Sequence, residues 1–323
     1  MKRFILIITA LVLSLQPLYA SQHEVTIPTP WGQISATLSL PDTETSTAIL
    51  IVAGSGPTDR NGNSPMGIST YCYAMLSDEL TEQGYAVLRY DKRGIGQSPL
   101  APELLSSVLF DDYVDDALLL VDYLHTEGYS EVVIVGHSEG GLIAQVAASR
   151  PDARIDGIVL LSSTGYPIDQ VLLRQLEAQL MPDHMGLMLA SHNILRSLKS
   201  GRTIAQERIP DELLSLFHPA VQPFLINQMS YNPQELARTS TLPMLIITGG
   251  YDIQVSVDNG EALAAEREDA RHITLEHMSH VLKDASSNDR MEQLMSVYSS
   301  SQYPLSEGLT DAIVEFLSSL SNL

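Results

Sequence analysis

The sequence predicts an α/β fold, in which a mostly parallel central sheet carries helices on both faces and a helical cap is inserted into it. Short apolar runs rich in β-branched residues alternate with stretches of helical spacing, as expected of a doubly wound sheet. Residues 166–240 break this alternation, because they are rich in leucine and methionine and contain no strand-like run. We therefore expect residues 21–165 and 241–323 to form the core and residues 166–240 to form the cap.

The first 20 residues are typical of a secretory signal peptide. Lys2 and Arg3 precede an apolar run over residues 4–15, and cleavage is expected after Ala20. The apolar run is shorter than the roughly 20 residues that span a bilayer. We therefore expect an exported protein, periplasmic or secreted, with no stable membrane insertion after cleavage.

Composition limits the partners. The formal net charge is −21, which argues against nucleic acid or an anionic membrane as a partner, because both attract basic surfaces. Cys72 is the single cysteine, so an intrachain disulfide and a cysteine metal cluster are both excluded. An exported chain without disulfides needs a large core, and roughly 300 residues can supply one.

The amino-terminal part predicts the beginning of the sheet. Residues 24–40 alternate polar and apolar side chains around a turn that contains Gly32, which indicates an antiparallel pair of strands. Residues 48–52 are continuously apolar, as in a strand that is covered on both faces.

A glycine-rich loop, residues 53–63, follows this buried strand. A phosphate-binding loop would need a lysine followed directly by a serine or threonine, and the segment lacks this pair of residues. A calcium loop is suggested by oxygen-bearing residues at alternate positions from Asp59 onward, but Ser64 and Thr70 stand where a glycine and a glutamate are required. The remaining interpretation is an oxyanion loop, in which the N–H group of Ser55 would bind a substrate carbonyl.

The next segments continue the alternation. Residues 71–83 are expected to be helical, residues 85–90 to form a strand, and residues 111–126 to form a helix whose first turn is acidic, where the helix dipole favours it. Residues 91–98 form a glycine turn with clustered charges. We expect these charges to pair and brace loops near the site rather than to act in catalysis.

Residues 132–141 carry the strongest functional signal. Four β-branched residues lead into Gly136-His137-Ser138-Glu139-Gly140, and a helical stretch of small residues follows. This pattern is typical of a nucleophile elbow, in which a serine at a strained strand-to-helix corner stands above the sheet. We expect Ser138 to be a nucleophile, the N–H of Glu139 to join that of Ser55 in an oxyanion hole, and His137 to be a packing residue.

Later apolar runs predict the rest of the sheet. They lie at residues 155–161, from residue 243 onward and, more weakly, at 271–275, and an amphipathic pattern over about 307–320 predicts a closing helix. Asp252 follows the strand that starts at 243, where a buried carboxylate can orient a histidine. The alternative carboxylate, Asp258, is expected to begin or cap a helix.

Three histidines are candidates for the general base that a serine hydroxyl needs at neutral pH. His272 lies in the weak strand, and His277 follows it directly. His280 lies in a loop before the next helical segment, from which it can reach the edge of the sheet. We expect His280 to be the base, with His277 as the main alternative.

Five segments together resemble the α/β-hydrolase superfamily, and in particular bacterial serine esterases akin to the serine-aminopeptidase-like (S33-like) hydrolases. They are residues 54–63, 90–98, 136–140, 250–252 and 279–283. The resemblance implies hydrolysis of a small-molecule carboxylic ester through a Ser138-Asp252-His280 triad and an acyl-enzyme, without metal or organic cofactor. Ala53 stands where many relatives carry a histidine, which leaves open which N–H groups form the oxyanion hole.

Two other functions stay open. A serine aminopeptidase shares the fold and the triad, but the tryptophan that such elbows carry beside the serine is absent here. A non-catalytic binding module typically loses a triad member, and none is lost. We therefore expect a serine esterase for short- to medium-chain acyl groups, while the substrate and the oligomeric state are not determined by the sequence.

Overall fold

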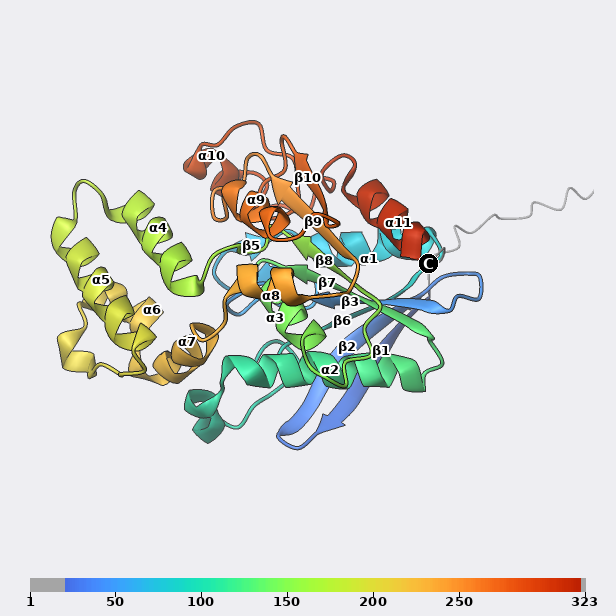
Figure 1. Ribbon diagram of the computed structural model, residues 1–323, viewed down its shortest axis with the longest axis horizontal. Coiled ribbons are helices and arrows are strands. Elements are labelled where there is room, and N and C mark those ends of the chain that lie inside the picture. The colour runs from blue at the N-terminus through green and yellow to red at the C-terminus, as the bar shows by residue number, and fades with distance from the viewer. Residues whose placement is uncertain (1–20, 321–323) are drawn as a thin grey trace, which may run out of the picture.

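The computed structural model describes residues 21–320, in which an eight-stranded sheet forms the centre of the fold (Figure 1). The strand order is β1-β2-β6-β3-β7-β8-β9-β10. The strands are β1 (Ser21–Thr29), β2 (Gly32–Leu40), β3 (Thr47–Val52), β6 (Ala86–Tyr90), β7 (Glu131–His137), β8 (Gly157–Leu161), β9 (Met244–Gly249) and β10 (Arg271–Leu275). Strands β1 and β2 are antiparallel, and all pairs from β6 through β10 are parallel.

Helices cover both faces of the sheet. The helices of the core are α1 (Cys72–Glu82), α2 (Phe110–Thr126), α3 (Glu139–Ala148), α9 (Asp258–Ala265), α10 (Arg290–Met295) and α11 (Leu309–Leu320), with a short 3-10 helix, η1, at Pro102–Ser107. Helices α1 and α11 pack on one face, whereas α2, α3 and α9 pack on the other. The predicted α/β class with a mostly parallel sheet is therefore confirmed.

The central strands divide their side chains between the two faces with a period of two. In β3, Ile49 and Ile51 contribute to the core under α1 and α11, whereas Leu50 and Val52 contribute to the core under α2 and α3. All four side chains are at most 2% exposed. A strand buried on both faces cannot alternate with polar residues, which explains the continuously apolar sequence.

The structure adds elements that the sequence pattern did not predict. Strands β4 (Asn63–Ser64) and β5 (Ile68–Ser69) form a two-stranded hairpin beside the loop after β3, and α10 lies between β10 and α11. The predicted signal peptide lies outside the described residues. No helix within residues 21–320 is long and apolar enough to cross a membrane.

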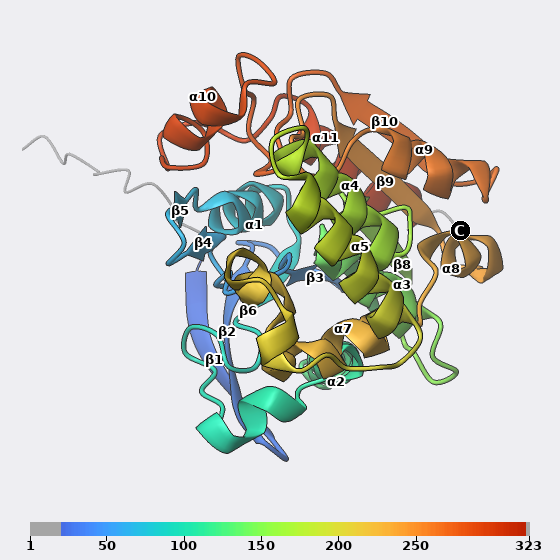
Figure 2. The ribbon, with the colours of Figure 1, turned by 90° about the vertical axis from the view of Figure 1, so that its left-hand side faces the viewer.

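The segment between β8 and β9, all of which the structure describes, contains helices joined by loops and no strand. Its helices are α4 (Ile168–Leu180), α5 (Met185–Lys199), α6 (Leu214–Phe217), α7 (Gln222–Gln228) and α8 (Pro233–Thr239), with 3-10 turns at Gln206–Arg208, Asp211–Leu213 and Pro219–Val221. Helices α4, α5 and α6 project from one end of the sheet (Figure 1), and the turned view places them in front of it (Figure 2). They share a small core of their own, which contains Leu198 and Phe217.

Helix α8 instead packs on the body of the protein. Ala237 is fully buried in the same core as α2 and α3, and α8 contacts α3 and α9. The cap is also joined to the body through polar contacts. The Gln175 amide donates to the Gln254 carbonyl at 2.9 Å, and the Asn227 amide donates to the Asp111 carboxylate at 2.9 Å.

Two glycines allow β7 to turn directly into α3. A Cβ on Gly136 would lie 2.3 Å from the carbonyl oxygen of Gly140, and a Cβ on Gly140 would lie 2.2 Å from the carbonyl oxygen of Val52. Both contacts are with backbone atoms, which cannot move aside without displacing a strand or the helix. The strand-to-helix corner therefore requires glycine at both positions.

We expect Gly140→Ala to lower the free energy of unfolding by at least about 2 kcal/mol, because the added methyl group displaces β3. Gly186→Ala is the matched control, since a Cβ there meets nothing within 4 Å in helix α5. That variant should leave the free energy of unfolding unchanged or raise it by up to about 1 kcal/mol. Urea unfolding of both variants measures these free energies. Equal unfolding midpoints for Gly140→Ala and Gly186→Ala would contradict the expectation.

Candidate active site

Ser138 lies at the corner between β7 and α3. Its φ of 54° and ψ of −119° fall in a region that residues with a side chain rarely occupy. The Ser138 N–H donates to the Leu161 carbonyl at 2.9 Å, and its carbonyl accepts from the Gly141 N–H at 3.0 Å and from the Ser163 hydroxyl at 3.2 Å. These contacts hold a strained backbone at the carboxyl end of the sheet.

Asp252 and His280 form a buried pair in the loops after β9 and β10. His280 Nδ1 lies 2.8 Å from Asp252 Oδ2, and the Asp252 side chain is 0% exposed. The other carboxylate oxygen accepts from the N–H groups of Gln254 and Val255, both at 2.8 Å. Because an ionised carboxylate only accepts hydrogen bonds, Nδ1 carries the proton, and Nε2 of the neutral ring is left as the basic nitrogen.

The pKa of Asp252 reflects opposing effects. Burial alone would raise it, but the charge and hydrogen bond of His280 and the N–H groups of Val255 and Gln254 outweigh burial, and the pKa lies below its usual value. The carboxylate is therefore ionised at neutral pH. An ionised carboxylate in this position holds the tautomer of the histidine and stabilises an imidazolium.

The alternative residues lie elsewhere. His272 Nε2 is 3.0 Å from the hydroxyl of Thr248, and the ring of His277 packs edge-on against Tyr251 with ring centres 5.2 Å apart. Asp258 begins helix α9 and pairs with Arg174 of the cap at 2.7 Å. The structure thus brings Asp252 to His280 rather than to the other two histidines.

The two expected oxyanion donors belong to the two segments that adjoin Ser138, the start of α3 and the loop after β3. Helix α3 begins at Glu139, and the N–H groups in the first turn of a helix have no acceptor within the helix. On the other side, a Cβ on Gly54 would lie only 3.2 Å from Ser138 Cβ, so the loop after β3 passes directly beside the serine. The Gly54 N–H donates to the Tyr73 hydroxyl at 3.0 Å, and the next N–H along the loop is that of Ser55.

His137, the last residue of β7, connects the loop after β10 to α1 and, through Tyr73, to the loop after β3. Its Nε2 lies 2.8 Å from the carbonyl oxygen of His280, and its Nδ1 lies 2.7 Å from the Tyr73 hydroxyl. Because a carbonyl can only accept, Nε2 carries the proton and Nδ1 accepts from Tyr73. The hydroxyl of Tyr73 then accepts from the Gly54 N–H, so all three hydrogen bonds point in one direction.

The direction of this chain requires a neutral His137. Burial lowers the pKa of His137 to about 3, with the nearby His280 as the second cause. Protonation would also remove the lone pair that accepts from Tyr73. His137 is therefore a fixed structural element and not a base, as expected, although the sequence did not reveal its hydrogen bonds.

Comparison with known proteins identifies the family. A family model described as serine aminopeptidase, S33, matches residues 66–284, which is more than half of the chain. The chain belongs to this family.

Relatives of this S33 chain include esterases. Esterase EstD of Thermotoga maritima is 28% identical over 240 residues, which cover 73% of this chain and 54% of that protein. The chain spans about half the length of the curated relatives that it matches.

Solved structures show the α/β-hydrolase fold. The esterase PF2001 of Pyrococcus furiosus superimposes with a TM-score of 0.59 at 17% identity and covers 96% of each chain. Est1E of Butyrivibrio proteoclasticus with bound ferulic acid gives a TM-score of 0.59 at 18% identity, covering 93% of this chain and 100% of that one.

The charges of residues 91–98 pair in this S33 chain, which confirms that they brace loops. Asp91 accepts from the N–H groups of Arg60 and Gln97 at 2.7 and 2.8 Å, and Arg93 pairs with Asp116 at 2.7 Å. Lys92 is different, because its ammonium group pairs with Glu139, the first residue of α3, at 3.3 Å.

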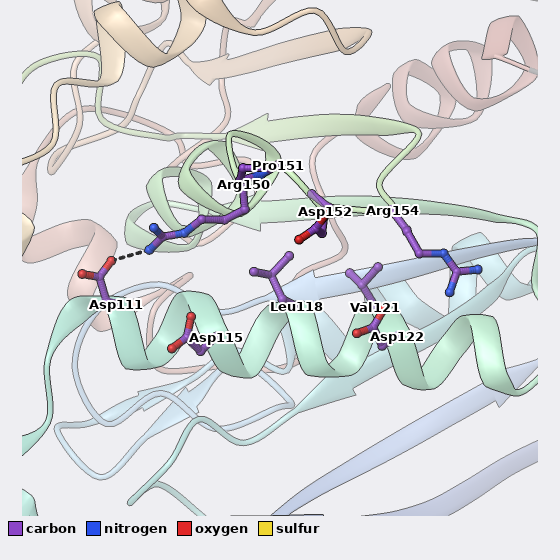
Figure 3. A pocket seen from close by; sticks show the side chains of 10 residues that line it. Asp111, Asp115, Leu118, Val121, Asp122, Arg150, Pro151, Asp152 and Arg154 are labelled. Atoms are coloured by element: carbon purple, nitrogen blue, oxygen red, sulfur yellow. Dashed lines mark hydrogen bonds and ion pairs between the residues drawn. The ribbon is translucent and has the colours of Figure 1, made fainter.

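A polar groove lies apart from these residues, between α2 and the loop after α3 (Figure 3). Its volume is about 540 Å³. Asp111 and Arg150 pair at one end of it, at 2.8 Å. The lining residues are Asp111, Asp115, Leu118, Val121, Asp122, Arg150, Pro151, Asp152, Ala153 and Arg154. The lining contains no histidine, cysteine, serine or threonine, so the groove holds no serine–histidine pair of the kind that the Ser138 corner and His280 provide.

The low pKa of His137 predicts a loss of stability in acid. The folded pKa of about 3 lies below the ordinary value of 6.5, so the unfolded chain binds this proton first as the pH falls. The stabilisation is complete above pH ~6.5 and is lost toward pH ~3, at up to about 1.4 kcal/mol per pH unit. His137→Gln, which cannot titrate, should therefore make the free energy of unfolding less dependent on pH between about 6.5 and 4.5.

Urea unfolding of both proteins at several pH values tests this expectation. The difference between them at pH ~8, where the imidazole of either state is neutral, gives the cost of the substitution itself. Parallel pH profiles for the two proteins would contradict the assignment of His137 as a buried neutral group.

Proposed function

We propose that this protein hydrolyses carboxylic esters through an acyl-enzyme formed on Ser138. The observation that carries the proposal is the buried Asp252–His280 pair, which comes from the loops after β9 and β10 at the same sheet edge as the strained Ser138 corner. The likeness to esterase EstD supports the ester as the substrate class.

The first half of the reaction forms the acyl-enzyme. His280 Nε2 takes the proton of the Ser138 hydroxyl as its oxygen attacks the ester carbonyl, and Asp252 stabilises the imidazolium that results. The N–H groups of Ser55 and Glu139 bind the developing oxyanion. When the tetrahedral intermediate collapses, the C–O bond to the alcohol breaks and His280 returns the proton to the leaving alkoxide.

The second half releases the acid. Water gives a proton to His280 Nε2 as its oxygen attacks the acyl carbonyl, and the bond to Ser138 breaks with return of the proton to the serine. Each step uses only groups of this chain and water.

The cap supplies the acyl specificity in this proposal. The chain leaves the sheet after β8 to form the cap and returns to the sheet at β9. The cap therefore begins at the same sheet edge as Ser138. A leucine- and methionine-rich cap suits a short- to medium-chain acyl group. We further propose export, which is supported by the signal-like pattern of residues 1–20.

A serine aminopeptidase is the second candidate, because the family model carries that description. Such an enzyme needs a carboxylate that binds the free α-amine of its substrate. Glu139, next to the nucleophile, already pairs with Lys92 and accepts from Gln228, and Asp169 of the cap pairs with Lys199. Because these two carboxylates already have partners within the protein, they are not free to bind an α-amine, which favours a neutral ester as the substrate.

Ser138→Ala should lower kcat by about four to six orders of magnitude, because the nucleophile is lost. Asp252→Asn should lower kcat by a similar or somewhat smaller factor, because the tautomer of His280 is no longer held. Asp258→Asn is the matched control, since this carboxylate pairs on the surface with Arg174, and its kcat should stay close to wild type. Steady-state kinetics with p-nitrophenyl butyrate would contradict the triad if Asp258→Asn cost as much as Asp252→Asn.

Substrate class is tested with p-nitrophenyl esters from acetate to palmitate beside alanine and proline p-nitroanilides. We expect Ser138-dependent cleavage of the esters, with a maximum at short to medium acyl chains, and far slower cleavage of the anilides. Comparable cleavage of the anilides would favour the aminopeptidase. No cleavage of either set, together with no labelling of Ser138 by a fluorophosphonate, would favour a binding module.

A further inference from the structure

We propose that Lys92 is a positioning residue for the oxyanion hole, which it organises by binding the peptide group that presents the Ser55 N–H. The inference rests on the proposed function, because it assigns a role in the same ester hydrolysis. Lys92 is 1% exposed, and a lysine is rarely buried to this extent unless its charge is used.

The first contact of Lys92 is with the oxyanion loop. Its Nζ donates to the Gly54 carbonyl oxygen at 2.6 Å. That carbonyl and the Ser55 N–H belong to the same peptide group, which is planar, so the C=O and N–H bonds point in opposite directions. A cation fixed on the carbonyl therefore determines where the N–H points.

A charged hydrogen bond at the carbonyl also strengthens the opposite end of the peptide. Polarisation of the C=O bond makes the N–H group a better donor, and this cooperative effect is larger in a buried site than in water. The ammonium group thus acts on the oxyanion through the peptide, without contacting the substrate.

The second contact of Lys92 is with the other half of the hole. Glu139, whose own N–H is the second expected donor, accepts from Lys92 through Oε1 at 3.3 Å and from Gln228 through Oε2 at 3.2 Å. The carboxylate balances the buried ammonium, which would otherwise be costly. Lys92 therefore joins the loop after β3 to the start of α3 across the nucleophile.

Tyr73 completes the support of Gly54. Its hydroxyl accepts from the Gly54 N–H at 3.0 Å, while Lys92 binds the Gly54 carbonyl. Both polar groups of this glycine are thus occupied by side chains from outside the loop. The glycines on either side of Ser55 allow this part of the loop many backbone conformations, so these two contacts fix the conformation at Gly54.

Kinetics of Lys92→Met test the role, because methionine has a similar length and neither charge nor donor. We expect kcat for p-nitrophenyl butyrate to fall about 10- to 100-fold, less than or similar to the loss of a direct oxyanion donor, with KM changed by less than about threefold. Binding of a trifluoromethyl ketone, which forms an oxyanion on Ser138, should weaken by the same factor as kcat. Lys92→Arg should restore part of the loss.

Arg271→Met is the matched control, since this cation pairs with Glu315 on the surface at 2.7 Å, and its kinetics should equal those of wild type. An unchanged kcat in folded Lys92→Met would overturn the proposal for Lys92 alone, provided that Ser138→Ala is inactive in the same assay. Equal weakening of substrate and ketone binding would also overturn it, because it would indicate general damage to the site.

NMR spectroscopy tests whether Lys92 binds the Gly54–Ser55 peptide group, and it does so without a measurement of enzyme activity. Gly54-Ser55 is the single Gly-Ser pair in the sequence, so ¹³C-carbonyl glycine combined with ¹⁵N-serine selects one amide. Its chemical shifts should move in Lys92→Met and stay in place in Arg271→Met. Unmoved shifts would overturn the proposal even if no ester were cleaved, whereas moved shifts without ester cleavage by wild type would overturn the proposed function instead.

Discussion

The site depends on the hydrogen bonds that run through Gly54. From its N–H, one directed chain passes to Tyr73, then to His137, and ends at the carbonyl of His280. From its carbonyl, a second contact passes through Lys92 to Glu139. Side chains therefore hold the loops after β3 and β10 and the corner between β7 and α3 in fixed positions relative to one another, whereas the sheet alone fixes only the strand ends. In a low-dielectric interior each unmade bond of such a network is costly, so the arrangement is cooperative.

The fold could be predicted from the sequence because its signals are local. Strands such as β3 and β7 are buried on both faces, so each is a short apolar run that needs no knowledge of its neighbours. The Ser138 corner is also local, since its glycines are required by contacts within a few residues and with the adjacent strand. The positions of Asp252 and His280 followed from the ends of predicted strands, and the structure brings these two side chains together.

The supporting residues could not be predicted, because their roles exist only in three dimensions. Tyr73 meets His137 from 64 positions away, and Gln228 meets Glu139 from 89 positions away. In the sequence, Tyr73 is an ordinary residue of an amphipathic helix, and Gln228 is an ordinary residue of the cap. The sequence places Lys92 in a charged turn, but its neighbours Asp91 and Arg93 form ion pairs that brace loops. Nothing in the spacing of the three residues indicates that the Lys92 side chain is the one directed toward Gly54 and Glu139. Strand β10 is partly exposed, which explains its weak pattern.

The insertion of the cap between β8 and β9 divides the reactive groups along the chain. Ser138 precedes the insertion, whereas Asp252 and His280 follow it. A single protease cut at residues 181–184, between α4 and α5, would therefore place the proposed nucleophile on one polypeptide and its proposed base on another. The parallel ladder of β8 and β9, from Ile158 paired with Met244 to Leu161 paired with Ile247, spans that cut. The two pieces would stay associated through the sheet, so cleavage of the folded protein in the cap would leave the ladder between them intact.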